Sequence, residues 1–328
     1  MTDCKKIIFT LCSNNYLAHA KTLGNSVKKY HPGSEFVIGL VDKPDPAINY
    51  NEFSDFTIVR FDEIRFDFFD EMLARYNVIE FNTAVKPFFI DFLFKKYGPG
   101  TKVLYIDPDI MLYSQIDFLF ELLDVNNVII TPNINKPATD VSMGELASLR
   151  HGMYNLGFIG MVQNEESNNF LKWWQSRLKT HCIINKSRGL FVDQKWIDLA
   201  PLFFNGIYPV RHLGCNMAWW NFEERILIQN GNKYFVNDNR EELVFFHFSG
   251  YRPGTTNYMA RWDNAKNYVD VDNALTNIFT EYTGLLKQNG YDFYYGLKPM
   301  LEFAVAKKES FARRVKRKVK EKVERYIK

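Results

Sequence analysis

The chain has 328 residues, of which 46% are hydrophobic and 16% aromatic. This composition can bury a large core, which excludes a largely disordered protein. The formal net charge of +3 conceals an uneven distribution, because residues 307–328 carry +8 and the remaining 306 residues carry −5. The mildly acidic body argues against a nucleic-acid-binding protein.

The cysteine pattern favours a reducing compartment. The four cysteines form no Cys-x-x-Cys pair and no secretory disulfide framework, so we expect buried thiols in a cytoplasmic protein. The first residues lead directly into an apolar run without a signal-peptide core, and no apolar stretch approaches membrane-spanning length. We expect a soluble protein, at most peripheral at the inner face of the cytoplasmic membrane.

The first forty residues predict a β-α-β unit. An apolar strand over residues 5–12 is followed by a natural helix cap at residues 13–15, by apolar residues at helical spacing, and by a second strand over residues 35–41. This order is the start of a parallel, doubly wound sheet. The end of the first strand then places Thr10 and Asn15 where a nucleotide base and ribose bind.

Lys86 falls at the start of a predicted helix. A third strand is expected over residues 56–59, and helices are expected over residues 66–76 and 84–97. Pro87 limits the start of the last helix, because proline is tolerated only in a first turn. The helix dipole does not favour a lysine there. A site where Lys86 and backbone N–H groups face one anion explains the position, and a plain surface lysine is the alternative.

The chain is organised around residues 103–112. An apolar run ends in Asp107 and Asp109, and a second short apolar run follows. The carboxyl ends of the strands face the ligand in an open α/β sheet, so two carboxylates there need a partner for their charge. A divalent cation bound to a diphosphate supplies it, since Mg²⁺ and Mn²⁺ take carboxylate and phosphate oxygens together. A solvated Asp-Pro turn is the alternative.

Strand and helix patterns alternate after the central stretch, and they are predicted over residues 116–123 (helix), 128–131 (strand), 154–161 (strand) and 165–178 (helix). The polar segment 133–150 lies between the two expected strands, and it predicts a mobile lid or an acceptor loop. The glycines of the strand over residues 154–161 indicate that its backbone lies close to another group. Asp193 and Gln194 mark a further helix start.

A histidine near the end of the body precedes a flexible turn. Residues 208–234 are rich in Asn and Trp and are not assigned from pattern, and a strand-like run then passes through His247. A lone histidine in an apolar strand is usually a core residue. Here it comes just before Gly250 and Arg252, a turn that ends in a bidentate phosphate binder, which favours a binding site.

Residues after 258 predict helices, and residues 307–328 predict a basic amphipathic helix. Its apolar stripe recurs every fourth residue from Phe311 to Ile327. This pattern suits docking on an anionic membrane surface or in the groove of a partner. A solvated terminal helix is the alternative.

Three motifs occur in a specific order: Tyr-Ile-Asp-Pro-Asp-Ile at residues 105–110, Asn-Leu-Gly-Phe-Ile at 155–159 and His-Phe-Ser-Gly-Tyr-Arg-Pro at 247–253. Together with Lys86 before a helix and the Asp-Gln pair at residues 193–194, they resemble the GT-A glycosyltransferases. The resemblance is to the glycogenin and lipopolysaccharide galactosyltransferase type, in a bacterial surface-polysaccharide branch. It spans roughly residues 5–253.

The resemblance implies an α/β architecture. The expected GT-A fold is Rossmann-like, with a mostly parallel twisted sheet flanked by helices. It implies a nucleotide-sugar transferase domain over residues 1–255 and a helical C-terminal region over residues 256–328 that ends in the basic amphipathic helix.

The resemblance also implies a metal site. Asp107 and Asp109 match the family's Asp-x-Asp motif, with Asp107 also meeting the ribose, and His247 matches the third protein ligand of Mn²⁺ or Mg²⁺. Arg252 stands where the family usually has lysine, and it follows Gly250 by two residues rather than three. It can still neutralise the leaving diphosphate.

The remaining implied roles concern the donor. Lys86 matches a basic position that contacts it. Asn155, Asp193 and Gln194 match positions that line the donor sugar, where Asp193 or Gln194 stabilises an oxocarbenium-like centre. The implied reaction moves a sugar from a nucleotide-diphosphate donor, expected to be a UDP-sugar, to a glycan or lipid-linked acceptor in surface-polysaccharide synthesis, with retention. No carboxylate nucleophile is evident, which favours a front-face displacement.

Two other interpretations stay open. A sugar nucleotidyltransferase also uses an α/β sheet and Mg²⁺, but it needs a glycine-rich amino-terminal loop, and the Cys-Ser-Asn-Asn run at residues 12–15 is not one. The other is a non-catalytic nucleotide-sugar-binding protein with a membrane-docking tail. Turnover of the donor with Mn²⁺ present separates this protein from an enzyme.

Truncation near residue 305 tests the membrane hypothesis. Each lysine or arginine near an anionic surface contributes about 1 kcal/mol to binding, so we expect the full chain to sediment with phosphatidylserine vesicles and the truncated chain to stay in solution. Hydrolysis of soluble donor serves as the control and should be unchanged. Equal vesicle binding by both chains would remove the hypothesis.

Overall fold

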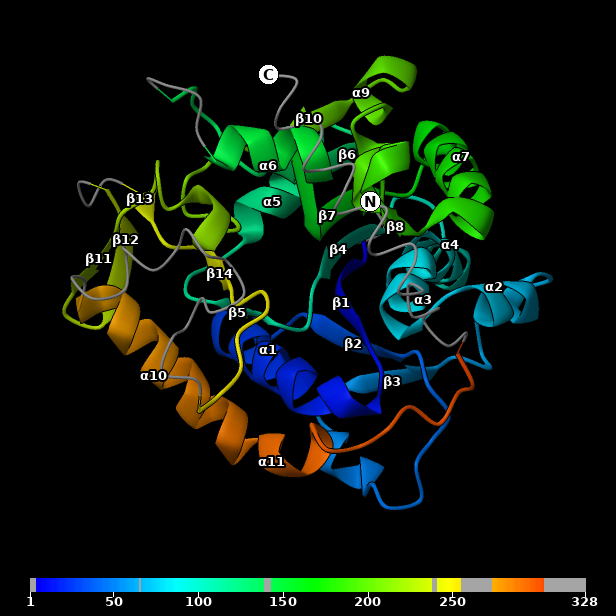
Figure 1. The fold of residues 1–328 in the computed structure, drawn as a ribbon, viewed down its shortest axis with the longest axis horizontal. Helices are drawn as coiled ribbons and strands as arrows, with labels where there is room; N and C mark the ends of the chain where they lie inside the picture. The colour runs from blue at the N-terminus through cyan, green and yellow to red at the C-terminus, as the bar shows by residue number, and fades with distance from the viewer. Residues whose placement is uncertain (1–3, 65, 139–142, 238–240, 255–272, 304–328) are drawn as a thin grey trace, which may run out of the picture.

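The structure is a computed structural model that describes residues 4–64, 66–138, 143–237, 241–254 and 273–303 (Figure 1). A seven-stranded sheet forms its centre, and its strands in spatial order are β10 (Ile207–Pro209), β6 (Val128–Pro132), β7 (Tyr154–Val162), β4 (Lys102–Ile106), β1 (Lys6–Cys12), β2 (Glu35–Leu40) and β3 (Thr57–Arg60). Adjacent strands are parallel except where β7 pairs with β4 and β6. The predicted mostly parallel α/β sheet is therefore confirmed.

Side-chain alternation along β1 gives the sheet two buried faces. Ile8 and Cys12 belong to the core on the side of α1 (Leu17–Tyr30), whereas Ile7 and Phe9 belong to the core that includes residues of α4 (Lys86–Tyr97) and α7 (Glu165–His181). A central strand with both faces covered is typical of a doubly wound sheet. The helices of Figure 1 accordingly form a layer on each side.

The carboxyl-terminal helices pack on α1. In Figure 1, α10 (Asn273–Gln288) and α11 (Tyr291–Tyr294) lie along the lower edge of the molecule, beside α1. Asn289, between them, donates from Nδ2 to Thr22 Oγ1 over 2.9 Å. The expected boundary at residues 255 and 256 and the basic helix over residues 307–328 lie outside the described residues. Among the described helices, none has both the length and the apolar character needed to cross a bilayer.

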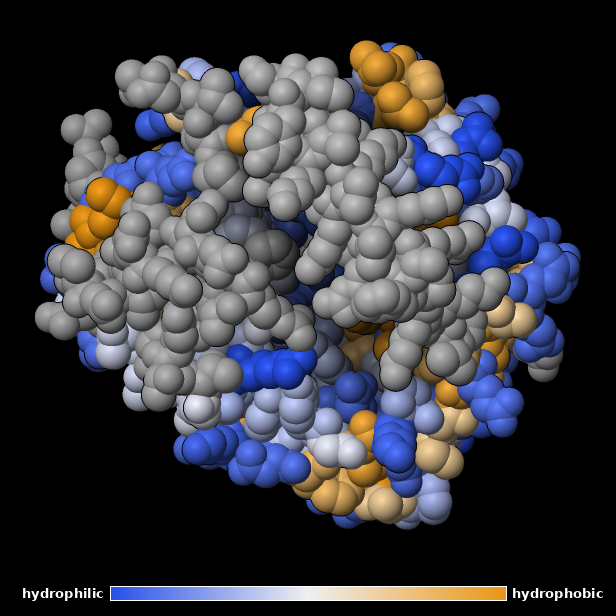
Figure 2. Space-filling view, in the orientation of Figure 1, coloured by the Kyte–Doolittle hydropathy of each residue, from blue (hydrophilic) through white to orange (hydrophobic). Residues whose placement is uncertain are grey.

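A small two-stranded sheet lies beside the main one. It joins β5 (Ile110–Leu112) to β14 (Phe245–His247) in antiparallel pairing. The remaining strands are β8 (Ile184–Asn185), β9 (Leu190–Phe191), β11 (Leu227–Asn230), β12 (Lys233–Val236) and β13 (Glu241–Glu242). The remaining α-helices are α2 (Phe69–Arg75), α3 (Val78–Ala84), α5 (Asp117–Leu122), α6 (Met143–His151), α8 (Gln194–Ile197) and α9 (Ala200–Phe203). Figure 2 shows an apolar patch over α9, where Leu202 and Phe203 are exposed.

Segment 133–150 was expected to be a mobile lid or an acceptor loop, and its second half is not a loop. The structure has helix α6 there. The helix packs against a 3₁₀ turn over Trp219–Asn221, which lies in the region that pattern left unassigned. Tertiary packing therefore stabilises a helix that its polar, glycine-containing sequence does not predict.

The structure also corrects the expected bounds of the helices in the first hundred residues. Ser13 makes no side-chain cap, because a 3₁₀ turn over Asn14–Tyr16 precedes α1. The helix expected over residues 66–76 spans Phe69–Arg75, and the one expected over residues 84–97 spans Lys86–Tyr97. A helix that was not expected, α3, precedes the second one and is capped by the side chain of Asn77. Three cysteines are buried thiols as expected, but Cys4 is exposed.

Gly39 in β2 offers a test of the core. A Cβ atom at this position would lie 2.4 Å from Leu11 and 2.5 Å from Phe89, and overpacking of this kind usually costs about 1–3 kcal/mol. We expect Gly39→Ala to lower the free energy of unfolding by that amount in denaturant titrations. The matched control is Gly33→Ala, because a Cβ atom there would meet nothing within 4 Å. Equal stability of the two variants would contradict the packing described.

Candidate metal centre

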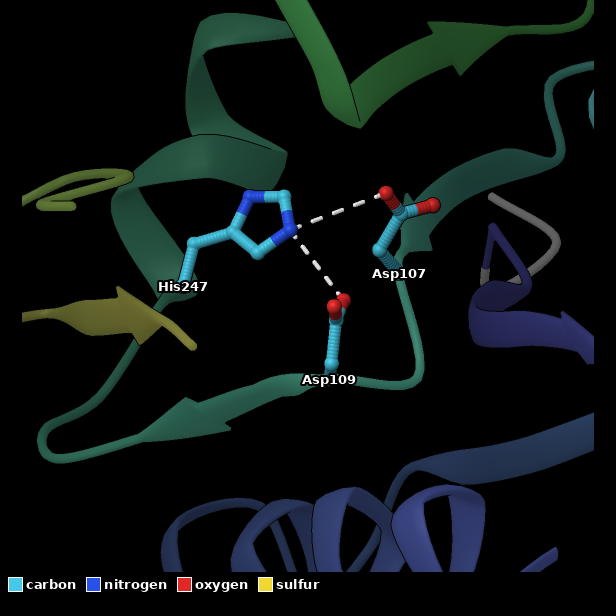
Figure 3. Close-up of side chains that lie close together, drawn as sticks. All are labelled: Asp107, Asp109 and His247. Atoms are coloured by element: carbon cyan, nitrogen blue, oxygen red, sulfur yellow. Dashed lines mark ion pairs between the residues drawn. The ribbon is translucent and has the colours of Figure 1, made fainter. Parts of the chain in front are cut away.

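Asp107, Asp109 and His247 meet at one point (Figure 3). His247 Nε2 lies 3.1 Å from Asp109 Oδ1 and 3.8 Å from Asp107 Oδ2. One ligand atom from each residue falls within 4.8 Å of the other two. Two carboxylates and an imidazole that converge in this way form a donor set for a divalent cation.

Backbone pairing brings the three residues together. The Asp107 N–H donates to Gly157 O over 2.7 Å, which fixes the end of β4 against β7. Beyond the turn, β5 pairs with β14 so that Ile110 lies opposite His247. The Phe248 N–H donates to Asp109 O over 2.9 Å and extends the same pairing. The three candidate metal ligands are therefore positioned by the backbone of four strands.

Gly157 makes room for the imidazole ring. A Cβ atom at this position would lie 2.5 Å from His247 Cε1 and 2.7 Å from its Nδ1. No side chain fits there without a shift of the ring. The expectation that this strand lies close to another group is confirmed, and the group is His247.

Burial and charge act in opposite directions on the three residues. Burial raises the pKa of Asp107 above its ordinary value. Burial also opposes ionisation of Asp109, yet the adjacent His247 lowers the pKa of that carboxyl. Burial alone would lower the pKa of His247, but the charges of Asp109 and Asp107 raise it. In the absence of a cation, the imidazole and Asp109 thus favour a charged pair.

Asn216 orients His247 from its far side. Its Oδ1 lies 3.1 Å from His247 Nδ1. Since an amide oxygen only accepts, this contact assigns the ring proton to Nδ1 and leaves the Nε2 lone pair for a cation when the ring is neutral. Asn216 itself adopts a left-handed backbone with φ of 57°, a conformation that asparagine tolerates better than most residues.

A chain of amide hydrogen bonds continues from Asn216 to the expected sugar-lining residues. Asn216 Nδ2 donates to Asn155 Oδ1 over 3.0 Å and to Thr131 Oγ1 over 2.8 Å. Asn155 Nδ2 in turn donates to Gln194 Oε1 over 3.4 Å. The structure thus connects His247, Asn155 and Gln194, although these residues are far apart in the sequence.

Lys86 is buried at the start of α4, where it was expected. Its Nζ donates to Asp193 Oδ2 and to Leu156 O, each over 2.7 Å, and it lies 4.3 Å from the centroid of the Tyr105 ring. The Tyr105 hydroxyl donates to Asp107 Oδ1. Lys86 therefore links Asp193 to the metal centre through Tyr105.

The remaining expected residues lie at the edges of the centre. Thr10 is buried in β1 with a hydroxyl that has no hydrogen-bond partner in the described part of the chain, and Asn15 is half-buried in the turn after it. Gly250 and Arg252 follow β14, and Gly250 has a φ of 76° that suits glycine.

A cavity of about 120 Å³ opens beside the amide chain. Asn155 and Gln194 line it, together with Trp220, whose ring meets His247 edge-on at 5.2 Å between centroids. Within the described residues, Trp220 Nε1 is a buried donor without a partner. The cavity therefore offers apolar faces and hydrogen-bonding groups beside the metal centre.

Asn216 and Trp220 are site residues that the sequence did not indicate. Both lie in the stretch over residues 208–234 that has no period of a helix or a strand. The composition of this stretch, which is rich in asparagine and tryptophan, is the sequence feature that could have indicated these two site residues.

Comparisons with known proteins reveal distant relatives. No protein-family model matches the chain. Two proteins of Bacillus subtilis (strain 168), both described as uncharacterized, are similar to it: YfnF is 27% identical over 180 residues and YfnD is 24% identical over 174 residues. The matches cover 53% and 52% of this chain, and 57% and 54% of the two relatives. The chain thus spans little more than half the length of the curated relatives it matches.

The fold of the chain is similar to that of a solved structure. The chain is similar to the apo form of the glycosyltransferase GlyE in Streptococcus pneumoniae TIGR4, with a TM-score of 0.50 and 15% identity. The match covers 87% of this chain and 63% of that chain. Likeness at this identity concerns the fold alone, and it confirms the glycosyltransferase fold expected from the motifs.

The close approach of Gly157 gives a direct test of the centre. We expect Gly157→Ala to push the His247 ring aside and to weaken Mn²⁺ binding about 10- to 100-fold, as loss of a ligand's support usually does. Calorimetric titration with Mn²⁺ measures it. The matched control is Gly160→Ala in the same strand, where the added Cβ atom meets Ile129 and Leu104 instead. Equal Mn²⁺ affinity of the two variants would contradict the geometry.

Proposed function

We propose that the chain is a metal-dependent glycosyltransferase that moves a sugar from a nucleotide-diphosphate donor to a glycan or lipid-linked acceptor. The observation that carries this proposal is the convergence of Asp107, Asp109 and His247 at the edge of a glycosyltransferase-type sheet. The expected donor is a UDP-sugar, and the expected process is synthesis of a cell-surface polysaccharide. Association with the membrane through residues 307–328 belongs to the same proposal.

The donor set suits Mn²⁺ or Mg²⁺. Carboxylate oxygens bind either ion, and an imidazole nitrogen beside them improves the relative affinity for Mn²⁺. Three protein ligands leave coordination positions for the oxygens of a diphosphate. When bound, the ion would neutralise the charge that develops on the leaving diphosphate.

Residues around the centre supply the other parts of the reaction. Arg252 is expected to neutralise the diphosphate from outside the metal centre. Asn155 and Gln194, which line the cavity, are expected to hold the donor sugar. The Lys86 ammonium donates hydrogen bonds to Asp193 and to Leu156 O. An ammonium has three N–H groups, so the expected contact of Lys86 with the nucleotide sugar would use the third.

The resemblance to the GT-A family implies retention, and the lack of an evident carboxylate nucleophile favours a front-face displacement. The carboxylate of Asp193 is engaged by Lys86, so its expected part is to stabilise an oxocarbenium-like centre and to hold the ammonium in place. The departing phosphate then accepts the proton of the acceptor hydroxyl. Removal of one preorganised electrostatic contact of this kind usually lowers turnover by about 10²–10³.

Asp109→Asn tests the proposal. We expect UDP to raise the melting temperature of the wild type only when Mn²⁺ is present, by mass action, and we expect the variant to lose this shift together with turnover of the UDP-sugar. Asp55→Asn is the control, because Asp55 is exposed and pairs only with Lys28 among the described residues.

The outcomes separate the candidate activities. A wild type that binds UDP with Mn²⁺ but never turns over a sugar donor would be a binding protein. A wild type that no nucleotide diphosphate or its sugar stabilises, or an Asp109→Asn variant that responds like the wild type, would contradict the proposal.

A further inference from the structure

A row of aromatic rings connects Arg252 with the first helix. Arg252 Cζ lies 5.7 Å from the centroid of the Tyr295 ring, just after α11. Tyr295 stacks on Tyr291 with centroids 4.9 Å apart and planes inclined by 20°. The Tyr291 ring meets His19 edge-on at 5.5 Å, and His19 stacks on Tyr16 at 4.5 Å. The row therefore runs from the turn after β14 to the start of α1.

The charge of Asp109 reaches two residues of this row, Tyr16 and His19. Burial raises the pKa of Tyr16; the charge of Asp109 raises it further, and that of Arg252 lowers it. Burial lowers the pKa of His19 to about 4, which the charge of Asp109 partly opposes. The charges of Asp109 and Arg252 thus act in opposite directions on the pKa of Tyr16.

The segment that carries Tyr295 is anchored to helix α1 on one side and to the end of β2 on the other. Before α11, Asn289 is bound to Thr22 of α1. After it, the N–H groups of Met300 and Leu301 donate to Asp42 Oδ1 over 2.8 and 2.9 Å. The Tyr295 ring is therefore held at a fixed place relative to β2 and α1.

We infer that Tyr295 is a positioning residue that holds the Arg252 guanidinium toward the leaving diphosphate. This inference rests on the proposed function, in which Arg252 meets that diphosphate. Arg252 is exposed, and an arginine side chain loses rotamer entropy when it binds a ligand. A guanidinium within cation–π distance of an aromatic ring has already lost part of that freedom. A cation fixed before charge develops stabilises that charge more than a mobile one.

The choice of arginine fits this arrangement. At this position the chain departs from the lysine of the resembling family. A planar guanidinium stacks on a ring and still presents N–H groups at its edge, whereas an ammonium is a compact, strongly hydrated charge. The ring of Tyr295 therefore matches the residue that this chain carries.

Binding of UDP and UMP to the full chain with Mn²⁺ tests the inference. We expect Tyr295→Leu to weaken UDP binding about two- to fivefold, the range for an exposed cation–π contact, and to leave UMP binding, which lacks the second phosphate, less affected. Tyr295→Phe keeps the ring and should bind UDP like the wild type. Phe293→Ala is the control, since Phe293 is an exposed residue of α11, two positions before Tyr295.

A double-mutant cycle separates positioning from a general structural effect. In an Arg252→Gln background, Tyr295→Leu should weaken UDP binding no further. Additive losses, or equal losses for UDP and UMP, would contradict the inference. If Tyr295→Leu does not fold, Arg252→Lys at an exposed site replaces it, and unchanged UDP binding by that variant is the contradicting result. A wild type that does not bind UDP refutes the proposed function itself.

Discussion

The antiparallel pairing of β5 with β14 is the interaction on which the centre depends. It brings a histidine from the end of the body to the two carboxylates that follow β4, and the backbone bond from Phe248 to Asp109 fixes the register. A slip of one residue would turn His247 to the opposite face of its strand, because strand side chains alternate. Gly157 then limits what can stand behind the ring. The backbone thus sets the position of the imidazole, and Gly157 and the side chain of Asn216 set its orientation.

The polar groups around the centre are buried, and their mutual hydrogen bonds offset the cost of removing them from water. Lys86 and Asp193 satisfy each other with help from Leu156 O, and the amides of Asn216, Asn155 and Gln194 form a continuous chain. Loss of one member would leave a partner buried without a hydrogen bond, which costs about 1–3 kcal/mol. The network gives the residues beside the cavity a single arrangement.

Local sequence signals account for much of the fold and for the residues of the centre. The β-α-β start, the break at Asp107 and Asp109 and the strand through His247 follow from periodicity and turn chemistry. Helix α6 and the position of Asn216 do not follow from these signals. Helix α6 depends on packing against Trp219–Asn221, and Asn216 lies where the backbone is left-handed. Neither feature produces a periodic pattern in the sequence. Lys86 was expected at its helix terminus, but its partner Asp193 depends on tertiary structure.

The most direct measurement of the central claim is pulsed electron paramagnetic resonance on Mn²⁺ added to the full chain with UDP. The electron-spin-echo modulation of Mn²⁺ reports whether a nitrogen nucleus is directly bound, and ¹⁵N labelling of histidine identifies the residue type. We expect one coupled imidazole nitrogen that disappears in His247→Gln. A spectrum with oxygen ligands alone, or a nitrogen signal that persists in the variant, would contradict the assignment of Asp107, Asp109 and His247 as the metal centre.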